Sequence, residues 1–265
     1  MHEPDRWATR SRSNPSDYGT NVSVRVEWFD AVCSIVIDRP EKRNAVDLAT
    51  LRDIAKAQNE ARNARVVVLS GAPPAFCSGA DLAGVEVGEF TDTLLDVLRG
   101  FGRLPGITIA AIDGPALGAG TQLAAACDVR VATPSSKFGV PAAKLGLAVD
   151  RWTVARVGSE AGWSAARFML LTGESVTAET LFGSFVHRLG DVASAVEWAR
   201  ELSQLAPLTI QAHKMALESM LGDGAAASFS VAEVEAARLA AWASADADEG
   251  RRAFMEKRPP RFEGR

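Results

Sequence analysis

A glycine-rich segment near the middle of the chain constrains the fold most strongly. Residues 114–132 read Gly-Pro-Ala-Leu-Gly-Ala-Gly-Thr-Gln-Leu-Ala-Ala-Ala-Cys-Asp-Val-Arg-Val-Ala. Gly118 and Gly120 flank Ala119 where helical apolar spacing begins, which predicts a tight turn that opens directly into a helix near Gly120. The first N–H groups of a helix have no partner inside it. The segment therefore predicts an available backbone donor at Ala119, with a favourable helix dipole behind it.

A second turn upstream complements the first. Residues 75–82 read Ala-Phe-Cys-Ser-Gly-Ala-Asp-Leu, in which Gly79 permits a tight turn and Asp81 is suited to cap a following helix. The backbone N–H of Ala80 is then a second donor. Two backbone donors aimed at one point form an oxyanion hole, which stabilises negative charge on a carbonyl oxygen.

Composition narrows the class of protein further. The 265 residues fit one large domain or two small ones, 47% are apolar, and the net charge of −4 gives no general attraction to nucleic acid or anionic membrane. No apolar run reaches the roughly 18 residues that span a bilayer. The cysteines at 33, 77 and 127 show no metal-ligand spacing. We expect buried thiols, no metal, and a reducing cytoplasmic location.

The first half of the chain alternates strands and helices. Val22–Trp28 and Val32–Ile37 predict a hairpin, and Asp47 is suited to cap a helix running to about Asn63. Further apolar strands are predicted at Val66–Leu69, Ile107–Ile112 and Val129–Ala132. This β-β-α repetition favours an α/β stack of turns with roughly parallel sheets.

From about residue 160 onward the pattern becomes helical. Apolar spacing predicts helices at Glu160–Leu171, Thr177–Phe182, Val192–Leu205, Thr209–Met220 and Ser228–Ala243. The chain ends in a basic segment, in which Pro259 and Pro260 must stop any helix.

From Val22 to Phe262 the chain resembles the crotonase superfamily of enoyl-CoA hydratases and isomerases. The resemblance rests on the two donor turns and on residues 39–45, Arg-Pro-Glu-Lys-Arg-Asn-Ala. It implies the ClpP/crotonase-like β-β-α spiral over residues 21–205. Residues 1–20 are polar and carry charges of both signs, which predicts a disordered tail. The resemblance further implies a helical oligomerisation region at 206–265, a homotrimer or a dimer of trimers, and a place in fatty acid metabolism.

The resemblance also implies a site for an acyl-CoA thioester, with no cofactor apart from the coenzyme A of the substrate. Ala80 and Ala119 take the donor positions, and Lys42 and Arg43 lie near the nucleotide phosphates. A solvated charged loop is the alternative for those two side chains. Phe254 and Lys257 match a motif presented to a neighbouring subunit's ligand, or else they form a basic helix end. The implied substrate-binding residues are Lys42, Arg43, Ala45, Ser78, Asp81, Leu82, Gly118, Ala142, Phe254 and Lys257.

The two glutamates that related hydratases use are absent. Gln122 and Ala142 occupy their positions, and neither side chain can take a proton from water. Losing a general acid–base group typically costs about 10²–10⁴ in rate. Asp150 aligns with a region where some crotonases place a catalytic aspartate, although it is equally suited to cap the helix that follows.

Other ionisable groups leave the chemistry open. Glu86 and Glu89 follow the first donor turn in a predicted loop, and either could act as an isomerase base or remain solvated. His187 and His213 accompany no nucleophile motif. Two functions follow: an enzyme that transforms acyl-CoA with weak or altered hydratase chemistry, and a non-catalytic acyl-CoA binding or carrier protein.

Overall fold

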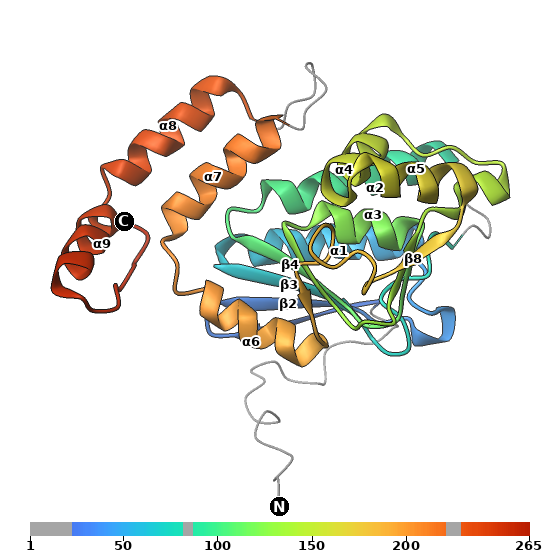
Figure 1. The fold of residues 1–265 in the computed structure, drawn as a ribbon, viewed down its shortest axis with the longest axis horizontal. Helices are drawn as coiled ribbons and strands as arrows, with labels where there is room; N and C mark the ends of the chain where they lie inside the picture. The colour runs from blue at the N-terminus through green and yellow to red at the C-terminus, as the bar shows by residue number, and fades with distance from the viewer. Residues whose placement is uncertain (1–22, 82–86, 221–228) are drawn as a thin grey trace, which may run out of the picture.

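The computed structural model describes residues 23–81, 87–220 and 229–265. The predicted tail at 1–20, Leu82 and Glu86 lie outside the described residues. Figure 1 shows a body built around a sheet and an arm of three helices that leads away from it.

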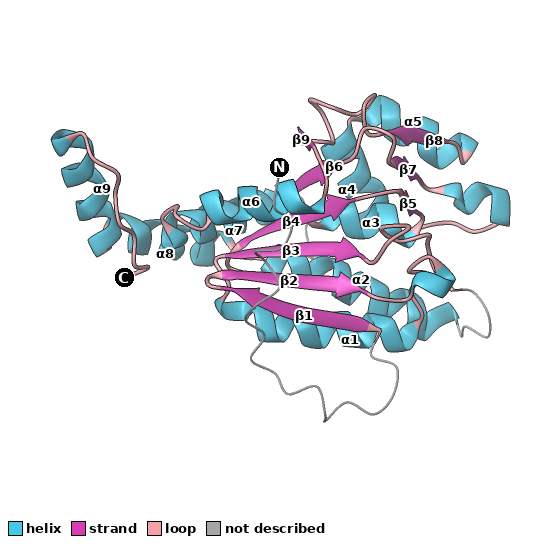
Figure 2. Ribbon diagram, turned by 90° about the horizontal axis from the view of Figure 1, so that it is seen from below, coloured by secondary structure: helices cyan, strands magenta, loops and turns pink. Residues whose placement is uncertain are grey.

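The body contains a six-stranded sheet in the order β1-β2-β3-β4-β6-β9 (Figure 2). Its strands are Val24–Phe29 (β1), Val32–Ile37 (β2), Val66–Gly71 (β3), Ile107–Ile112 (β4), Val129–Ala132 (β6) and Arg188–Leu189 (β9). β1 and β2 form the predicted antiparallel hairpin, and every later neighbour in this sheet is parallel. Parallel neighbours require crossover connections, which the helices supply.

Both faces of this sheet are covered, which explains the wholly apolar strands. Val67 and Leu69 of β3 belong to the core beneath α1 (Leu48–Glu60), α2 (Val87–Arg103) and α3 (Ala119–Ala126). Val66 and Val68 face the other way, onto Ala195 and Ala199 of α6 (Val192–Leu202). The predicted cap is confirmed, because Asp47 Oδ1 accepts from Thr50 N–H at 2.8 Å.

A smaller sheet has the order β5-β7-β8, formed by Pro115–Leu117, Lys137–Gly139 and Ser175–Thr177. The predicted helix at Thr177–Phe182 is wrong. Its first residue, Thr177, belongs to β8 and pairs with Lys137 of β7, and turns follow. The spacing there matched a helix by chance, and pairing with β7 decided the conformation.

The remaining short helices are Pro40–Lys42 (η1), Ala61–Asn63 (η2), Pro141–Leu145 (η3), Arg151–Ala161 (α4) and Trp163–Thr172 (α5). The single helix predicted at Glu160–Leu171 is therefore wrong in its start. Gly162 has a φ of +82° and separates α4 from α5. A glycine adopts this backbone conformation without a steric penalty, so the chain breaks there.

The arm consists of α7 (Pro207–Met220), α8 (Val231–Trp242) and α9 (Ala245–Glu256). Two ion pairs of 2.7 Å fasten α7 to the body, Lys214 to Asp128 and Glu218 to Arg156. Helix α8 packs on α7, and α9 packs on α8. Across the described residues, no helix combines the length and the apolar character that crossing a membrane requires.

Candidate functional site

The first donor turn is held by backbone pairing to the loop after η1. Val46 N–H donates to Gly79 O at 2.9 Å, and Asp81 N–H donates to Val46 O at 2.8 Å. Along an extended strand, successive backbone groups point to opposite sides. The carbonyl of Gly79 and the N–H of Asp81 both face Val46. The N–H of Ala80, which lies between them, therefore points away from Val46. The pairing thus sets the direction of the first donor.

The second donor turn lies against the first, and the approach at Gly120 is one that only glycine allows. Leu117 N–H donates to Cys77 O at 2.9 Å. A Cβ on Gly118, whose φ is +53°, would lie 3.7 Å from the Cα of Gly79. A Cβ on Gly120 would lie only 2.2 Å from Cys77 O. The two turns are therefore in direct contact, and a side chain at residue 120 would force them apart.

Helix α3 begins at Ala119, with Gly118 as its N-terminal cap. This start lies within a residue of the predicted one. Within residues 23–81, 87–220 and 229–265, no acceptor bonds the N–H of Ala80 or of Ala119. All eight residues of α3 are buried, so the positive end of its dipole meets the turns inside the protein. Two backbone donors at adjoining turns suit the binding of a partly negative oxygen.

A cluster of charges joins the loop at 39–45 to the first donor turn. Arg39 Nη2 lies 2.9 Å from Asp47 Oδ2 and 3.4 Å from Asp81 Oδ2, and Lys42 Nζ lies 3.8 Å from the same Asp81 oxygen. The prediction that Asp81 caps the following helix stays a prediction, because residues 82–86 lie outside the described residues. Asp81 pairs with the two cations Arg39 and Lys42. Sequence reasoning did not single out Arg39, although it opens the Arg-Pro loop.

Asp47 shows how this cluster acts on a titrating group. Burial alone would raise the pKa of Asp47, but hydrogen bonds from Thr50 and the charge of Arg39 outweigh burial and lower it. Asn44, also not singled out, is fully buried, and its Nδ2 donates to Ala72 O and Ala75 O at 2.6 Å each. Asn44 thus anchors the loop to the segment that leads into the first donor turn.

The loop residues predicted to bind substrate lie together beside this turn. Ser78 N–H donates to Arg43 O at 3.0 Å, and Ser78 Oγ donates to Lys42 O at 3.2 Å. Ala45 is half-buried, whereas the side chains of Lys42 and Arg43 are exposed. The structure thereby brings these residues into one region with Ala80 and Gly118. Their exposure leaves both side chains accessible to an anion in solution, and Lys42 also pairs with Asp81 at 3.8 Å.

The side chains behind the second donor form a hydrogen-bonded chain. Gln122, 5% exposed on α3, donates from Nε2 to Thr153 Oγ1 at 3.1 Å. Thr153 Oγ1 in turn bonds Asp150 Oδ2 at 2.7 Å, and Thr153 N–H donates to Asp150 Oδ1 at 3.0 Å. Asp150 is exposed and caps α4, as its alternative role predicted. Thr153 was not predicted, because only the packing of α4 on α3 gives it a role.

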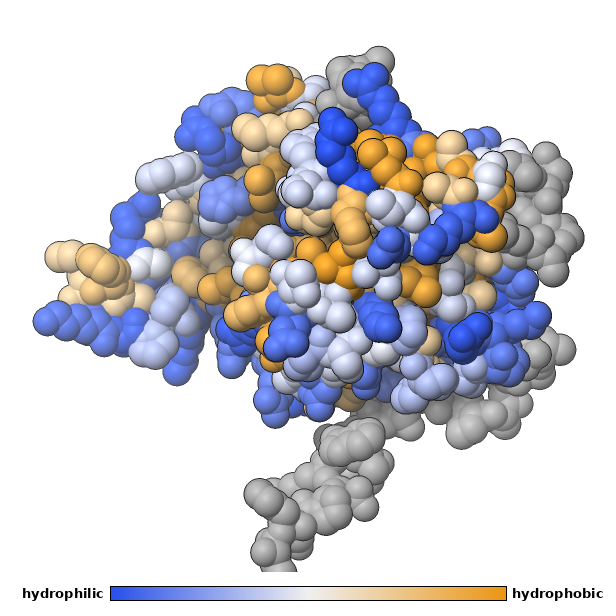
Figure 3. All heavy atoms as spheres, turned by 45° about the vertical axis from the view of Figure 1, so that its right-hand side comes forward, coloured by the Kyte–Doolittle hydropathy of each residue, from blue (hydrophilic) through white to orange (hydrophobic). Residues whose placement is uncertain are grey.

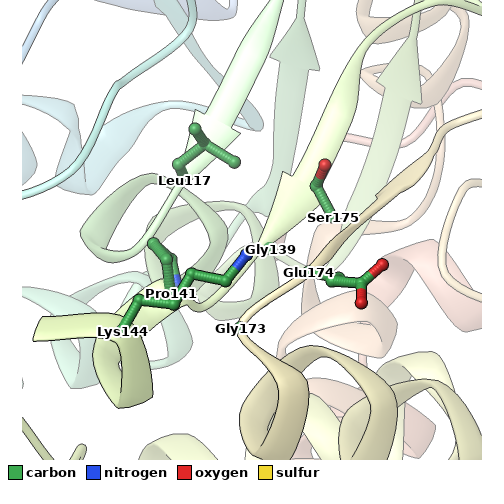
Figure 4. Close-up of a pocket in the computed structure, with 7 residues that line it drawn as sticks. All are labelled: Leu117, Gly139, Pro141, Lys144, Gly173, Glu174 and Ser175. Carbon is green, nitrogen blue, oxygen red and sulfur yellow. The ribbon is translucent and has the colours of Figure 1, made fainter. Parts of the chain in front are cut away.

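A pocket of about 250 Å³ adjoins the second donor turn (Figure 4). It is lined by residues of β5, β7, η3, β8 and the turn after α5, namely Leu117, Gly139, Pro141, Lys144, Gly173, Glu174 and Ser175. Gly139 O accepts from Gly118 N–H at 2.8 Å, so the pocket shares its wall with the donor turn. Ala142 follows Pro141 in η3 and is half-buried. It contributes a methyl group and no ionisable group.

Several predicted residues lie away from this region. Phe254, in α9, is 83% exposed, and Lys257 ends that helix with a φ of +53°. Figure 1 places α9 at the far end of the arm from α3 and α4. The loop predicted for Glu89 is wrong, because Glu89 belongs to the first turn of α2 and pairs with Arg52.

Neither histidine joins the donor turns. His213 is exposed on α7. His187 Nδ1 accepts from the backbone N–H of Arg130 at 3.2 Å. His187 is exposed as a residue, but desolvation of its ring against the protein, together with the charge of Arg130, lowers its pKa to about 4. The cysteines at 33, 77 and 127 are buried, as predicted, and burial raises the pKa of each to about 12.

Comparisons with known proteins agree with this architecture. The family model described as enoyl-CoA hydratase/isomerase matches residues 27–265. A probable enoyl-CoA hydratase echA6 of Mycobacterium tuberculosis is 41% identical over 245 residues, covering 91% of this chain and 99% of its own. The mitochondrial methylglutaconyl-CoA hydratase of Mus musculus is 30% identical over 287 residues, covering 98% and 91%.

Solved structures give the same result. An enoyl-CoA hydratase from Bacillus anthracis has a TM-score of 0.82 at 27% identity, covering 92% of this chain and 100% of its own. An enoyl-CoA hydratase/carnithine racemase from Magnetospirillum magneticum has a TM-score of 0.80 at 30% identity, covering 93% and 97%. The predicted crotonase fold is confirmed. The chain belongs to the enoyl-CoA hydratase/isomerase family.

Proposed function

We propose that this protein binds a fatty acyl-CoA or enoyl-CoA thioester, with the carbonyl oxygen between the N–H groups of Ala80 and Ala119. The observation that carries the proposal is the contact between the two donor turns, where both N–H groups lack an acceptor in the described chain. Membership of a family described by enoyl-CoA chemistry supports a thioester as the ligand. The pocket beside Leu117 is a candidate for the acyl chain. This activity belongs to fatty acid metabolism.

The chemistry proposed for this site is weak or altered hydration. Hydration needs one group that takes a proton from water and another that delivers a proton to the α-carbon. Gln122 and Ala142 supply neither, and Asp150 already accepts two hydrogen bonds from Thr153. Oxyanion stabilisation alone still contributes several kcal/mol to lowering a barrier. Slow turnover is therefore compatible with this site.

A non-catalytic role is the second candidate. The absence of an ionisable side chain at both glutamate positions of the family favours an acyl-CoA binding or carrier protein. The donor turns serve such a role equally well, because they bind the ground-state carbonyl as well as a transition state. The two candidates differ in turnover and agree on binding.

The proposed cation contacts come from two subunits. Lys42 or Arg43 meets the nucleotide phosphates from the loop beside the first donor turn, and Lys257 meets them from a neighbouring subunit. The arm favours assembly, since Trp242 and Phe254 are 66% and 83% exposed. Figure 3 shows further apolar side chains on the face that carries α4 and α5, where Trp163 is 60% exposed. We propose a homotrimer or a dimer of trimers in the cytoplasm.

Calorimetry with a matched pair of ligands tests the proposal. Butyryl-CoA carries the thioester carbonyl, and S-butyl-CoA is a thioether of the same chain length without that oxygen. We expect butyryl-CoA to bind at least about tenfold more tightly, since two donors lose their acceptor in the thioether. Equal affinities would show that the donor turns do not hold the carbonyl. Light scattering on the same sample tests assembly, and a monomer at micromolar concentration would contradict the proposed oligomer.

A further inference from the structure

The turn that carries the second donor contains no polar side chain of its own. Residues 115–120 read Pro-Ala-Leu-Gly-Ala-Gly, and the glycines on both sides of Ala119 give this backbone wide conformational freedom. The peptide group between Gly118 and Ala119 carries the Gly118 carbonyl and the Ala119 N–H, which point in opposite directions. Gln122 N–H donates to Gly118 O at 3.1 Å. The first turn of α3 therefore sets the direction of the donor, and whatever holds that turn aims the donor.

Thr121, the first polar side chain after this stretch, holds the turn. Thr121 is fully buried. Its Oγ1 lies 2.6 Å from Ala116 O and 2.9 Å from Gly139 O, either of which can accept the hydroxyl proton. The same Oγ1 accepts from Gly139 N–H at 3.0 Å. One hydroxyl thus joins the first turn of α3 to both β5 and β7.

These contacts close a loop around the donor. Thr121 bonds Ala116 across the ends of the loop, and its other partner, Gly139, also accepts from Gly118 N–H at 2.8 Å. Ala119 lies between these points of attachment. Among the described residues, no side chain but that of Thr121 forms a hydrogen bond with this loop. The side-chain support of the second donor therefore comes from a single hydroxyl.

We infer that Thr121 is a positioning residue, whose hydroxyl fixes the first turn of α3 on the small sheet and so aims the Ala119 N–H at the carbonyl oxygen of the ligand. This role rests on the proposed thioester site. Removing the hydroxyl leaves the buried Gly139 N–H without its acceptor, and a turn that shifts to satisfy this N–H moves the donor with it. The loss then falls on ligands that carry the carbonyl oxygen.

Thr121→Val tests the role, because valine has about the size of threonine and no hydroxyl. Calorimetry with butyryl-CoA and its thioether analogue S-butyl-CoA gives the ratio of the two affinities. We expect the variant to bind butyryl-CoA about three- to tenfold more weakly than the wild-type protein does, and S-butyl-CoA within about a factor of two. A wild-type ratio in this variant would overturn the inference and leave the thioester proposal intact. Equal affinities for the two ligands in the wild-type protein would overturn both.

Thr108→Val is the matched structural control. Thr108 is also buried, in β4, and its Oγ1 donates to Asp128 Oδ2 at 2.8 Å. We expect both valine variants to unfold at lower urea concentrations than the wild-type protein, and only Thr121→Val to lose the preference for butyryl-CoA. An equal loss of preference in the two variants would show a general loosening of the fold and overturn the positioning role.

A second pair of variants keeps the test decisive if Thr121→Val fails to fold. Thr121→Ser and Thr121→Ala both lack the methyl group and differ from each other only in the hydroxyl. We expect the serine variant to keep the wild-type ratio of affinities and the alanine variant to lose it by about three- to tenfold. Equal ratios in the serine and alanine variants would overturn the inference.

Discussion

The candidate site has a backbone half and a side-chain half, and the two halves depend on different features of the chain. Ala80 and Ala119 offer main-chain N–H groups, which the surrounding turns set in place. In the proposed function, Gln122 and Ala142 stand at positions where the chemistry depends on the side chain itself. Any residue except proline at position 119 retains the backbone N–H donor. A single substitution at a catalytic side chain, in contrast, removes an acid or a base. Binding can therefore persist in a member of this family after its acid–base chemistry is lost.

The largest expected effect is the restoration of the side-chain half. We expect Gln122→Glu combined with Ala142→Glu to raise the hydration rate of crotonyl-CoA by about 10²-fold or more, since a general acid–base group contributes about 10²–10⁴. Loss of the enoyl thioester absorbance measures the rate. The control is Ala142→Gln in the wild-type background, which adds an amide of similar size and should leave the rate low. A double variant no faster than this control would contradict the account of the side-chain half.

One methyl group added at Gly120 should disrupt the contact between the two donor turns. We expect Gly120→Ala to lower the free energy of unfolding by about 1–3 kcal/mol and to weaken butyryl-CoA binding, because the added Cβ meets Cys77 O at 2.2 Å. Gly250→Ala in α9 is the matched helical control, since its Cβ meets only Phe262 at 3.5 Å. Urea unfolding of both variants measures the effect. Equal stability of the two variants would show that the contact between the turns is not tight.

The pH dependence of stability should reflect a group outside the site. Desolvation of the imidazole ring, with the Arg130 charge, lowers the pKa of His187 to about 4, below the ordinary value of 6.5. The unfolded chain then binds more protons than the folded one between these values, so His187 stabilises the fold above pH 6.5 and loses that contribution toward pH 4. We expect His187→Asn, whose Oδ1 can accept from Arg130, to lose less thermal stability between pH 7 and pH 5. A parallel decline in both proteins would contradict this role.

The smallest expected effect concerns the proposed contact between subunits. Lys257 is exposed, and exposed charges contribute little individually and are screened by salt. We expect Lys257→Ala to weaken acyl-CoA binding by less than about fivefold at low ionic strength, and by less still at high ionic strength. Lys56→Ala, which removes an exposed lysine of α1, should leave binding unchanged. Calorimetry that finds no difference between the two variants at either salt concentration would remove Lys257 from the site.

Local features of the molecule were predictable from the sequence, and long-range contacts were not. The caps formed by Asp47 and Asp150 involve residues three positions away, so short-range patterns reveal them. The role of Thr153 depends on how α4 packs on α3, and no spacing within either helix indicates it. Thr177 was assigned to a helix for the same reason, since its pairing with Lys137 spans distant parts of the chain.

In the site itself, the glycine turns were identified because their shape requires glycine. The charges around Asp81 are harder to predict, because Arg39 reaches it across 42 residues of sequence. Glu89 was placed in a loop because Gly84 and Gly88 precede it, and glycines near a helix start weaken the helical pattern. The family resemblance indicated the candidate donors, and the structure added the residues that hold their turns in place.

Turnover of crotonyl-CoA by the wild-type protein, measured beside its affinity for butyryl-CoA, tests the central claim most directly. The account predicts saturable binding of butyryl-CoA and hydration far slower than about 10 s⁻¹, a typical enzymatic rate. Tight binding with slow hydration would show that the backbone half works without the side-chain half. Hydration at about 10 s⁻¹ or faster would contradict the claim, because it would require an acid–base pair that Gln122 and Ala142 cannot supply.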